Sequence, residues 1–253
     1  MKINDAVLEF NNVSFSYPQS QHILDKLAFR IKPGEFVSII GASGTGKSTI
    51  FRLIVGLEQP TKGSIYLNGV EETNRLGKLG YMPQKDLLLP WRNVLENVAL
   101  PLETENRKYD KGAVLQQLEA VGLGRVHDKY PNELSGGMRQ RVSFLRASQA
   151  ASDLLLLDEP FSALDAMTKL HMQEWLLTQW NQTETSIVFI THDIAEALFL
   201  SDKIFVIREA PIQMVEEIEV PLKRPRQRQQ LDTPQLIELK NELMNLFNMQ
   251  VIR

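Results

Sequence analysis

The sequence contains no cysteine and only four histidines among its 253 residues. The lack of cysteine excludes disulfide bonds, thiolate metal sites and cysteine nucleophiles. An excess of basic residues is also missing, since the formal net charge is −3 and the pI is about 5.9. This balance argues against a nucleic-acid partner that is held by overall charge.

Long apolar runs are missing as well, because the longest contain four residues, such as "LLLL" at 154–157. A helix that spans a bilayer needs about 20 apolar residues, so we expect no membrane span. The stretch "MKINDAVLEF" carries acidic residues and an asparagine where a signal peptide needs an apolar core. We therefore expect the chain to stay in the compartment where it is made.

The residues that are present, 43% hydrophobic and 23% charged, indicate a globular protein of one large or two small domains. Short β-forming stretches alternate with helical patterns, which favours an α/β fold with a parallel core sheet. Residues 87–151 are helical in pattern and predict an inserted lobe. The expected strands lie within 7–16, 36–40, 63–69, 154–158, 186–193, 203–209 and 214–220, and other helices within 47–57, 171–180 and 193–201.

The sequence divides near residue 220. Residues 1–220 carry the α/β pattern, and residues 221–253 hold a connector and an amphipathic helix. The connector "PLKRPRQRQQ" is rich in proline and arginine, and we expect a solvated linker, with contact to anionic lipid as the alternative. The helical pattern that follows places four leucines on one face, so we expect it to pack on the core, with a regulatory role as the alternative. These are Leu236, Leu239, Leu243 and Leu246.

The stretch "GASGTGKST" at 41–49 follows a predicted strand and opens a predicted helix. It fits the phosphate-loop pattern, in which glycines let backbone amides wrap the phosphates of a nucleotide. Lys47 would reach the β- and γ-phosphates, and the Ser48 hydroxyl would ligate Mg²⁺. The alternative is an ordinary glycine-rich turn before a helix. The expected ATP-binding residues are Gly41, Ala42, Ser43, Gly44, Thr45, Gly46, Lys47, Ser48 and Thr49.

Two carboxylates end the buried strand "LLLLDEP", at the sheet edge where α/β proteins bind ligands. Asp158 fits a holder of Mg²⁺, and Glu159 fits the base that orients or deprotonates an attacking water. An acid pair that caps a neighbouring helix is the alternative. His192 ends another predicted strand at the same edge, where contact with a γ-phosphate competes with an ordinary surface or core role.

A second anion site is predicted in "ELSGGMRQR" at 133–141. Ser135, Gly136 and Gly137 would place a hydroxyl and unobstructed amides at the start of a helix, where the dipole is positive. One ATP molecule does not need two such loops. Taken alone, Gln84 is an ordinary loop residue and Tyr17 an ordinary packing residue.

Together these stretches resemble the nucleotide-binding subunit of an ATP-binding cassette (ABC) transporter over nearly the whole chain. The resemblance implies a P-loop NTPase cassette with a mostly parallel core sheet, an antiparallel β lobe and an inserted helical lobe. It identifies 41–49 as the Walker A loop, 133–141 as containing the ABC signature, 154–160 as Walker B and "SALD" at 162–165 as the D-loop. Tyr17 corresponds to the adenine-stacking aromatic, Gln84 to the Q-loop glutamine and His192 to the switch histidine.

The resemblance implies that Lys47, Gln84, Glu159 and His192 are catalytic, with Mg²⁺ held by Ser48, Gln84 and Asp158. In this family two cassettes face each other head to tail, so Ser135, Gly136, Gly137 and Asp165 would contact the ATP of a second copy. The two loops would then serve two ATP molecules. Closure of the dimer on ATP is the power stroke of the family.

The segment "KDLLLPWRNVLENVALPLE" at 85–103 holds an apolar loop with a tryptophan. From the residues alone, a buried loop anchor is as plausible as a contact surface. In the family, the region after the Q-loop glutamine contacts the membrane subunit, which makes Leu88, Leu89, Pro90 and Trp91 interface residues. The run "LLPW…NV…NV" resembles importers of nitrate, sulfonate, taurine and thiamine precursors.

The family resemblance implies a peripheral subunit on the cytoplasmic face of the membrane. Its partners would be a second copy, an integral membrane permease and an extracytoplasmic substrate-binding protein, with no nucleic acid. A soluble ABC ATPase that acts on nucleic acid or ribosomes is the alternative, although the chain has one cassette and no long coiled-coil insertion. A catalytically inactive cassette is a third reading, against which the intact motifs argue.

Overall fold

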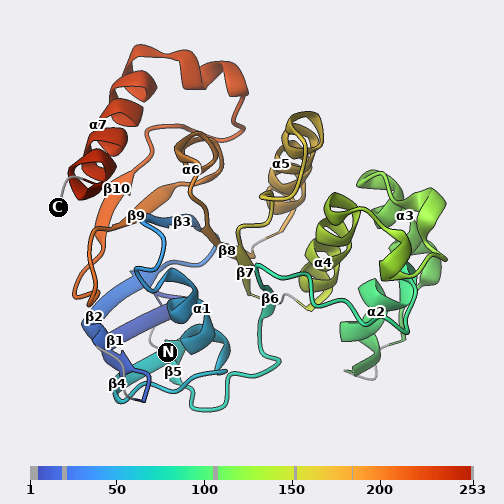
Figure 1. The fold of residues 1–253 in the computed structure, drawn as a ribbon, viewed down its shortest axis with the longest axis horizontal. Helices are drawn as coiled ribbons and strands as arrows, with labels where there is room; N and C mark the ends of the chain where they lie inside the picture. The colour runs from blue at the N-terminus through green and yellow to red at the C-terminus, as the bar shows by residue number, and fades with distance from the viewer. Residues whose placement is uncertain (1–4, 19–21, 105–107, 151–152, 184, 252–253) are drawn as a thin grey trace. The chain divides into compact units, whose positions relative to one another are not determined.

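The computed structural model describes residues 5–18, 22–104, 108–150, 153–183 and 185–251 (Figure 1). Residue 151, the predicted end of the helical lobe, lies outside them. The chain divides into two compact units, Met1–Leu76 with Glu184–Arg253, and Gly77–Thr183. No helix among the described residues is both long and apolar enough to cross a membrane.

The first unit contains two sheets and three α-helices in its described parts. Its elements are β1 (Leu8–Ser16), β2 (His22–Ile31), β3 (Phe36–Gly41), α1 (Lys47–Val55), β4 (Lys62–Leu67), β5 (Val70–Glu71), β8 (Ser186–Ile190), α6 (Ile194–Leu200), β9 (Lys203–Ile207), β10 (Glu216–Glu219), the short 3₁₀ helix η3 (Arg228–Asp232) and α7 (Pro234–Val251).

One sheet of this unit is antiparallel, in the order β2-β1-β4-β5. In the other sheet, β3 lies between β8 and β9 and is parallel to both, while β10 pairs with β9 antiparallel. The sheets meet through aromatic side chains, because the Phe29 ring of β2 lies 5.5 Å from the Phe205 ring of β9. The mostly parallel core and the antiparallel lobe agree with the predicted fold class.

Strand β2 was not among the strands that we predicted. Its second half alternates between buried and exposed positions, with Leu27, Phe29 and Ile31 buried. This is the period of a strand with one solvated face. The first half lacks the alternation, which is why the stretch does not stand out in the sequence.

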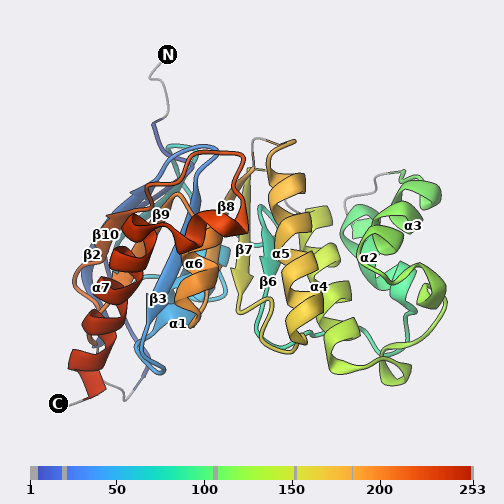
Figure 2. The same ribbon diagram turned by 90° about the horizontal axis from the view of Figure 1, so that it is seen from above.

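The second unit holds two short parallel strands and a group of helices. The elements are β6 (Gly80–Met82), α2 (Val94–Thr104), α3 (Lys111–Ala120), η1 (Gly124–Val126), η2 (Pro131–Glu133), α4 (Gly136–Ala150), β7 (Leu154–Asp158) and α5 (Ala166–Trp180). Figure 2 shows α2, α3 and α4 packed beside one another, with close contacts between α2 and α4. All five positions of β7 are buried, as expected of a core strand.

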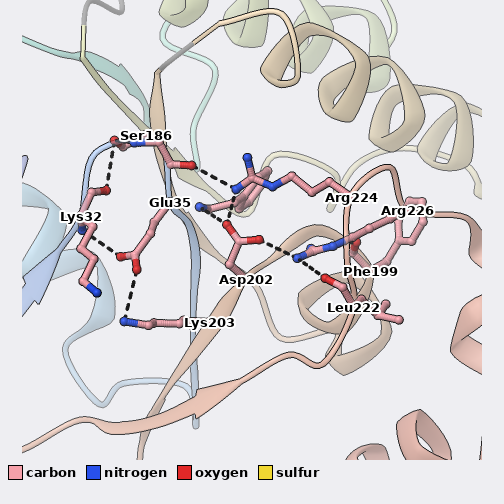
Figure 3. Close-up of polar contacts among 11 residues, drawn as sticks. Lys32, Glu35, Ser186, Phe199, Asp202, Lys203, Leu222, Arg224 and Arg226 are labelled. Atoms are coloured by element: carbon pink, nitrogen blue, oxygen red, sulfur yellow. Dashed lines mark hydrogen bonds and ion pairs between the residues drawn. The ribbon is translucent and has the colours of Figure 1, made fainter.

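The connector after residue 220 is held to the first unit by its arginines. The Asp202 carboxylate lies between Arg224 and Arg226 and forms an ion pair with each (Figure 3). The Arg226 side chain is only 1% exposed and also donates to the Phe199 carbonyl, at 3.3 Å. The Arg228 guanidinium lies 4.7 Å from the centre of the Phe199 ring. Most connector positions are exposed, as in the solvated linker that we expected. The paired arginines additionally fasten the connector to the unit, since a buried arginine must be paired.

Helix α7 follows the connector and packs on α6. Leu236 and Leu243 are buried in a cluster with Ala197 and Leu198 of α6, and Leu239 and Leu246 cover its edge. These four leucines form the predicted apolar face.

Candidate functional site

The glycine-rich loop runs from the end of β3 at Gly41 to the first residue of α1, Lys47. It is closed as a turn, because the Thr45 hydroxyl and amide both donate to the Ala42 carbonyl, at 2.9 and 3.5 Å. Positions 42–44 are exposed. The loop therefore stands at the carboxyl end of a buried parallel strand, where α/β proteins bind ligands.

Gly46 is the N-cap of α1, with φ 102° and no side chain to cap the helix. A Cβ atom at this position would lie 2.5 Å from the Ile23 side chain, so glycine is required by both conformation and space. Because no side chain caps it, the first turn of α1 offers its amides and the positive end of its dipole to an anion. This geometry fits a phosphate group.

The Lys47 ammonium lies inside the loop rather than in solvent. It donates to the carbonyls of Gly41 and Ala42, at 2.8 and 2.7 Å, and the residue is 8% exposed. A cation held by the carbonyls of this loop adds positive charge where phosphate oxygens would bind. Ser48 follows in the first helical turn and is partly exposed. A hydroxyl oxygen is a ligand that suits a hard cation such as Mg²⁺.

Tyr17 follows β1 and lies beside α1. Its hydroxyl accepts a hydrogen bond from Arg52 of α1, at 3.1 Å, and its ring meets the Phe15 ring edge-on at 4.9 Å. These contacts hold a partly exposed aromatic ring against the helix that the phosphate loop opens. The arrangement is compatible with stacking on a base, and packing also accounts for it.

His192 leaves the sheet at the same edge as the phosphate loop. Ile190 of β8 is opposite Ile39 of β3, and the Thr191 amide donates to the Ile39 carbonyl, at 3.3 Å. Two residues further along β3, Gly41 begins the loop. Thr191 is buried whereas His192 is exposed, so the histidine occupies the solvent side of this edge.

In the second unit, Glu159 follows β7 in a left-handed backbone conformation, with φ 51°. A residue with a Cβ rarely adopts this region, which indicates that the turn is fixed by its surroundings. Asp158 is 3% exposed and Glu159 is partly exposed. The Gln84 side-chain amide donates to the Glu159 carboxylate, at 3.2 Å. The structure thus brings together two of the predicted catalytic side chains, from segments 75 residues apart.

Gln140 of α4 fixes the backbone of this turn, a role that the sequence did not reveal. Its side-chain nitrogen donates to the Glu159 carbonyl at 3.0 Å and to the Ser162 hydroxyl at 3.2 Å. Its side-chain oxygen accepts from the Ala163 amide at 2.9 Å. The Gln140 side chain is buried and makes all three of these bonds. It therefore links the signature helix to the segment that follows Walker B.

Ser135 caps α4, because its hydroxyl accepts from the Met138 amide at 3.3 Å. Gly136 begins the helix as predicted, and Gly137 lies close to the D-loop. A Cβ on Gly137 would lie 3.2 Å from the Leu164 side chain and 3.3 Å from the Ala163 carbonyl. A hydroxyl that accepts one bond still carries its own donor, so Ser135 remains able to bind an anion.

Asp165 ends the D-loop and caps α5, where its carboxylate accepts from the Thr168 amide at 3.1 Å. Hydrogen bonds from Thr168 lower the pKa of the Asp165 carboxyl. The residue is therefore ionised at neutral pH, and in this structure it serves as the N-cap of α5.

The apolar loop after Gln84 is fixed by polar side chains. Arg146 of α4 donates to the carbonyls of Asp86 and Leu87, at 2.6 and 2.8 Å, and burial lowers the pKa of its guanidinium. Asn97 is fully buried and bonds both the amide and the carbonyl of Leu89, at 2.9 and 3.2 Å. A rigid loop therefore presents its remaining apolar side chains.

Of the predicted interface residues, Trp91 is 71% exposed and Pro90 is exposed, while Leu88 and Leu89 are partly buried. Leu87, which we did not include, is 61% exposed. Its backbone is left-handed, with φ 45°, a conformation that the sequence alone does not reveal for a leucine.

A phosphate loop between a buried parallel strand and a helix, with an acid pair at the end of another buried strand, defines a P-loop nucleotide-binding protein. Residues 24–162 match the family model of the ABC transporter. The chain belongs to the ABC transporter family and has the fold of its ATPase cassette.

Relatives support the importer group that the sequence predicted. The chain is 42% identical to the formylaminopyrimidine import ATP-binding protein ThiZ of Halalkalibacterium halodurans, over 92% of this chain and 90% of that protein. It is also 42% identical to the nitrate import ATP-binding protein NrtC of Synechococcus elongatus, over 90% of this chain and 35% of that one. The same identity holds to the aliphatic sulfonates import ATP-binding protein SsuB of Bacillus cereus, over 81% of both chains.

Among solved structures, the chain resembles the ATP-binding cassette MJ0796, a dimer in a post-hydrolysis state bound to ADP and phosphate. The TM-score is 0.76 at 30% identity, and the match covers 85% of this chain and all of that one. The predictions of family and fold are therefore confirmed.

Proposed function

We propose that this chain is the ATP-hydrolysing subunit of an ABC importer for a small anionic or heterocyclic solute. The proposal is carried by the 42% identity, over 92% of the chain, to an import ATP-binding protein. The three relatives named above are all import proteins, which favours this reading over a soluble ATPase that acts on nucleic acid or ribosomes.

In the proposed hydrolysis, each of the sites described above has its own role. The amides of 41–49 and the Lys47 ammonium bind the phosphates of ATP, and Tyr17 stacks on the adenine. Mg²⁺ would be held by oxygen atoms of Ser48, Gln84 and Asp158, a donor set that suits this cation. When bound, it would neutralise charge on the β- and γ-phosphates.

Glu159 orients or deprotonates the attacking water, and Gln84 holds its carboxylate in place. His192 contacts the γ-phosphate and stabilises the charge that develops there. The fixed turn at Glu159 supports this role, since a base must be positioned before it can act.

Ser135, Gly136, Gly137 and Asp165 would serve the ATP bound to a second copy of the chain. The exposed start of α4 supports this proposal, because Ser135 and Gly136 are exposed in the unit to which they belong. The dimer would close on ATP and reopen after hydrolysis. In this proposal, residues 1–220 form the nucleotide-binding domain, with a helical lobe near 87–151, and residues 221–253 form its C-terminal appendage.

The remaining partners are a membrane permease and an extracytoplasmic substrate-binding protein, so the chain would lie on the cytoplasmic face of the membrane. The exposed Leu87, Pro90 and Trp91 support a docking role, because large apolar side chains on a rigid loop favour protein contact. Leu88 and Leu89 would contribute their exposed portions.

The test is co-purification with a tagged Glu159→Gln chain, solubilised gently from membranes in the presence of ATP and Mg²⁺. Mass spectrometry should identify a polytopic membrane protein in an amount about equal to the tagged chain. Trp91→Ala in the same background should reduce this recovery, while Leu57→Ala, at another exposed leucine, should not. Recovery of ribosomes or DNA, without a membrane protein, would refute the importer assignment.

A further inference from the structure

The turn after β8 holds His192 between two residues whose side chains are committed to hydrogen bonds. The Thr191 hydroxyl donates to the Glu196 carboxylate at 2.5 Å and accepts from the Asp193 amide at 3.0 Å. Thr191 is 2% exposed and Glu196 is 6% exposed, so this pair is shielded from water. The hydroxyl of Thr191, which precedes the histidine, thus also binds the amide of Asp193, which follows it.

Asp193 completes the arrangement by capping α6. Its carboxylate accepts from the amides of Ala195 and Glu196, at 2.9 and 3.2 Å. The helix therefore already has an N-cap, and its start does not require the bond between Thr191 and Glu196. That bond must contribute something other than capping.

The bond between Thr191 and Glu196 restricts the backbone conformation next to residue 192. A buried carboxylate is costly unless it is hydrogen-bonded, so Glu196 and Thr191 constrain each other strongly. Thr191 is fixed on its other side by the bond from its amide to Ile39 of β3, the strand that leads into the phosphate loop. The backbone on both sides of His192 is thus held relative to that loop, while the imidazole is on the exposed side.

We propose that Thr191 and Glu196 are positioning residues for ATP hydrolysis, which hold His192 in register with the phosphate loop through the buried hydroxyl–carboxylate bond. This inference rests on the proposed function, because it takes His192 to contact the γ-phosphate. A misplacement of about 1 Å in such a contact lowers the rate by up to about a hundredfold.

The first experiment compares Thr191→Val with Thr191→Ser in the full chain. Valine keeps the shape but removes the hydroxyl, and serine keeps the hydroxyl. With saturating Mg²⁺-ATP, Thr191→Val should lower kcat by about tenfold or more, with KM for ATP within about twofold. Thr191→Ser should stay within about threefold of the parent kcat. An unchanged kcat in Thr191→Val would overturn the proposal.

The second experiment combines Thr191→Val or Thr191→Ser with His192→Ala and measures the slow residual turnover with radiolabelled ATP. If Thr191 acts through His192, Thr191→Val should lower the residual rate by less than about twofold. A loss that multiplies the loss of His192→Ala would overturn the positioning role. If His192→Ala itself hydrolyses ATP at the parent rate, the proposed role of His192 fails, and this inference fails with it.

Glu196 provides a check from the other side of the bond, which matters if Thr191→Val does not fold. Glu196→Gln keeps an acceptor for the Thr191 hydroxyl and should retain kcat within about threefold, whereas Glu196→Ala should repeat the loss. Melting temperatures of all variants separate a local effect from unfolding. Equal kcat values in the folded Gln and Ala variants would contradict the proposal.

Discussion

The helices α1 and α4 both start beside glycine and serine residues, yet their N-termini are capped differently. At α1, the N-cap is Gly46, which offers no side chain, and the Lys47 ammonium lies among the loop carbonyls. At α4, the Ser135 hydroxyl caps the helix itself. The first helix leaves its amides to a ligand, and the second satisfies part of its own end.

In our proposal, this difference accounts for two phosphate sites of unequal strength in one chain. The loop of α1 combines uncapped amides with a buried cation, and in our proposal these bind the phosphates of ATP. The start of α4 has small residues and a hydroxyl, so in our proposal it adds contacts to an ATP that another copy already holds. The comparison yields four predictions, which run from the largest effect to the smallest.

Lys47→Ala should abolish hydrolysis, with a loss of at least about a hundredfold, and should also weaken ATP binding. The ammonium is the only side-chain cation that the described loop places among its own carbonyls. Binding can be measured by titration with a fluorescent ATP analogue, and turnover by phosphate release. Near-normal turnover would contradict the assignment of the loop.

Ser135→Arg should also remove hydrolysis, by about a hundredfold, but should leave binding of ATP to an isolated chain within about threefold. The bulky cation blocks the start of α4 and leaves the residues of the α1 loop unchanged. The same binding and turnover assays apply, at a protein concentration low enough to keep the chain monomeric for the binding step. If affinity fell together with hydrolysis, Ser135 would act on the ATP of its own chain.

Gly46→Ala should destabilise the fold by about 1–3 kcal/mol, because its Cβ enters the Ile23 side chain and φ is positive. Gly44→Ala is the matched control, since φ is also positive there but no atom lies within 4 Å of the added carbon. In urea unfolding, the free energy of unfolding of Gly46→Ala should therefore be lower than that of Gly44→Ala. Equal stability of the two variants would show that Ile23 yields without cost.

Ser135→Ala should cost about 1 kcal/mol of stability through the lost cap of α4. Ser135→Asn, which retains a capping oxygen, should recover most of it. Urea unfolding measures both. If Ser135→Ala unfolds at the same urea concentration as the parent, the hydroxyl does not cap the helix in solution.

Much of the fold could be predicted, because the elements with the clearest sequence patterns are buried strands next to turns. The stretches before and after the phosphate loop, and the strand that ends at Asp158, have patterns that local physics determines. The strand β2 and the docked connector could not be predicted in the same way. The connector depends on Asp202, whose carboxylate pairs with arginines 22 and 24 residues away.

The candidate site shows the same division. Motif spacing located the phosphate loop, the acid pair and the start of α4, because each is a local feature. The contact between Gln84 and Glu159, and the bonds of Gln140 to the Walker B turn, join segments that are distant in sequence. The roles of Gln140 and Glu196 required the structure, since a single polar residue in a helix gives no signal of its partners.

The measurement that tests the central claim most directly is the ATPase rate of a mixture of Lys47→Ala and Ser135→Arg chains, each inactive alone. If the two phosphate sites serve two ATP molecules across a dimer, a mixed pair contains one intact site. This site combines the α1 loop of the Ser135→Arg chain with the α4 start of the Lys47→Ala chain. We predict that mixing restores hydrolysis in proportion to the mixed dimers that form. If the mixture is as inactive as its parts while the mixed dimers are demonstrably present, both sites act on the ATP of their own chain and the account is wrong.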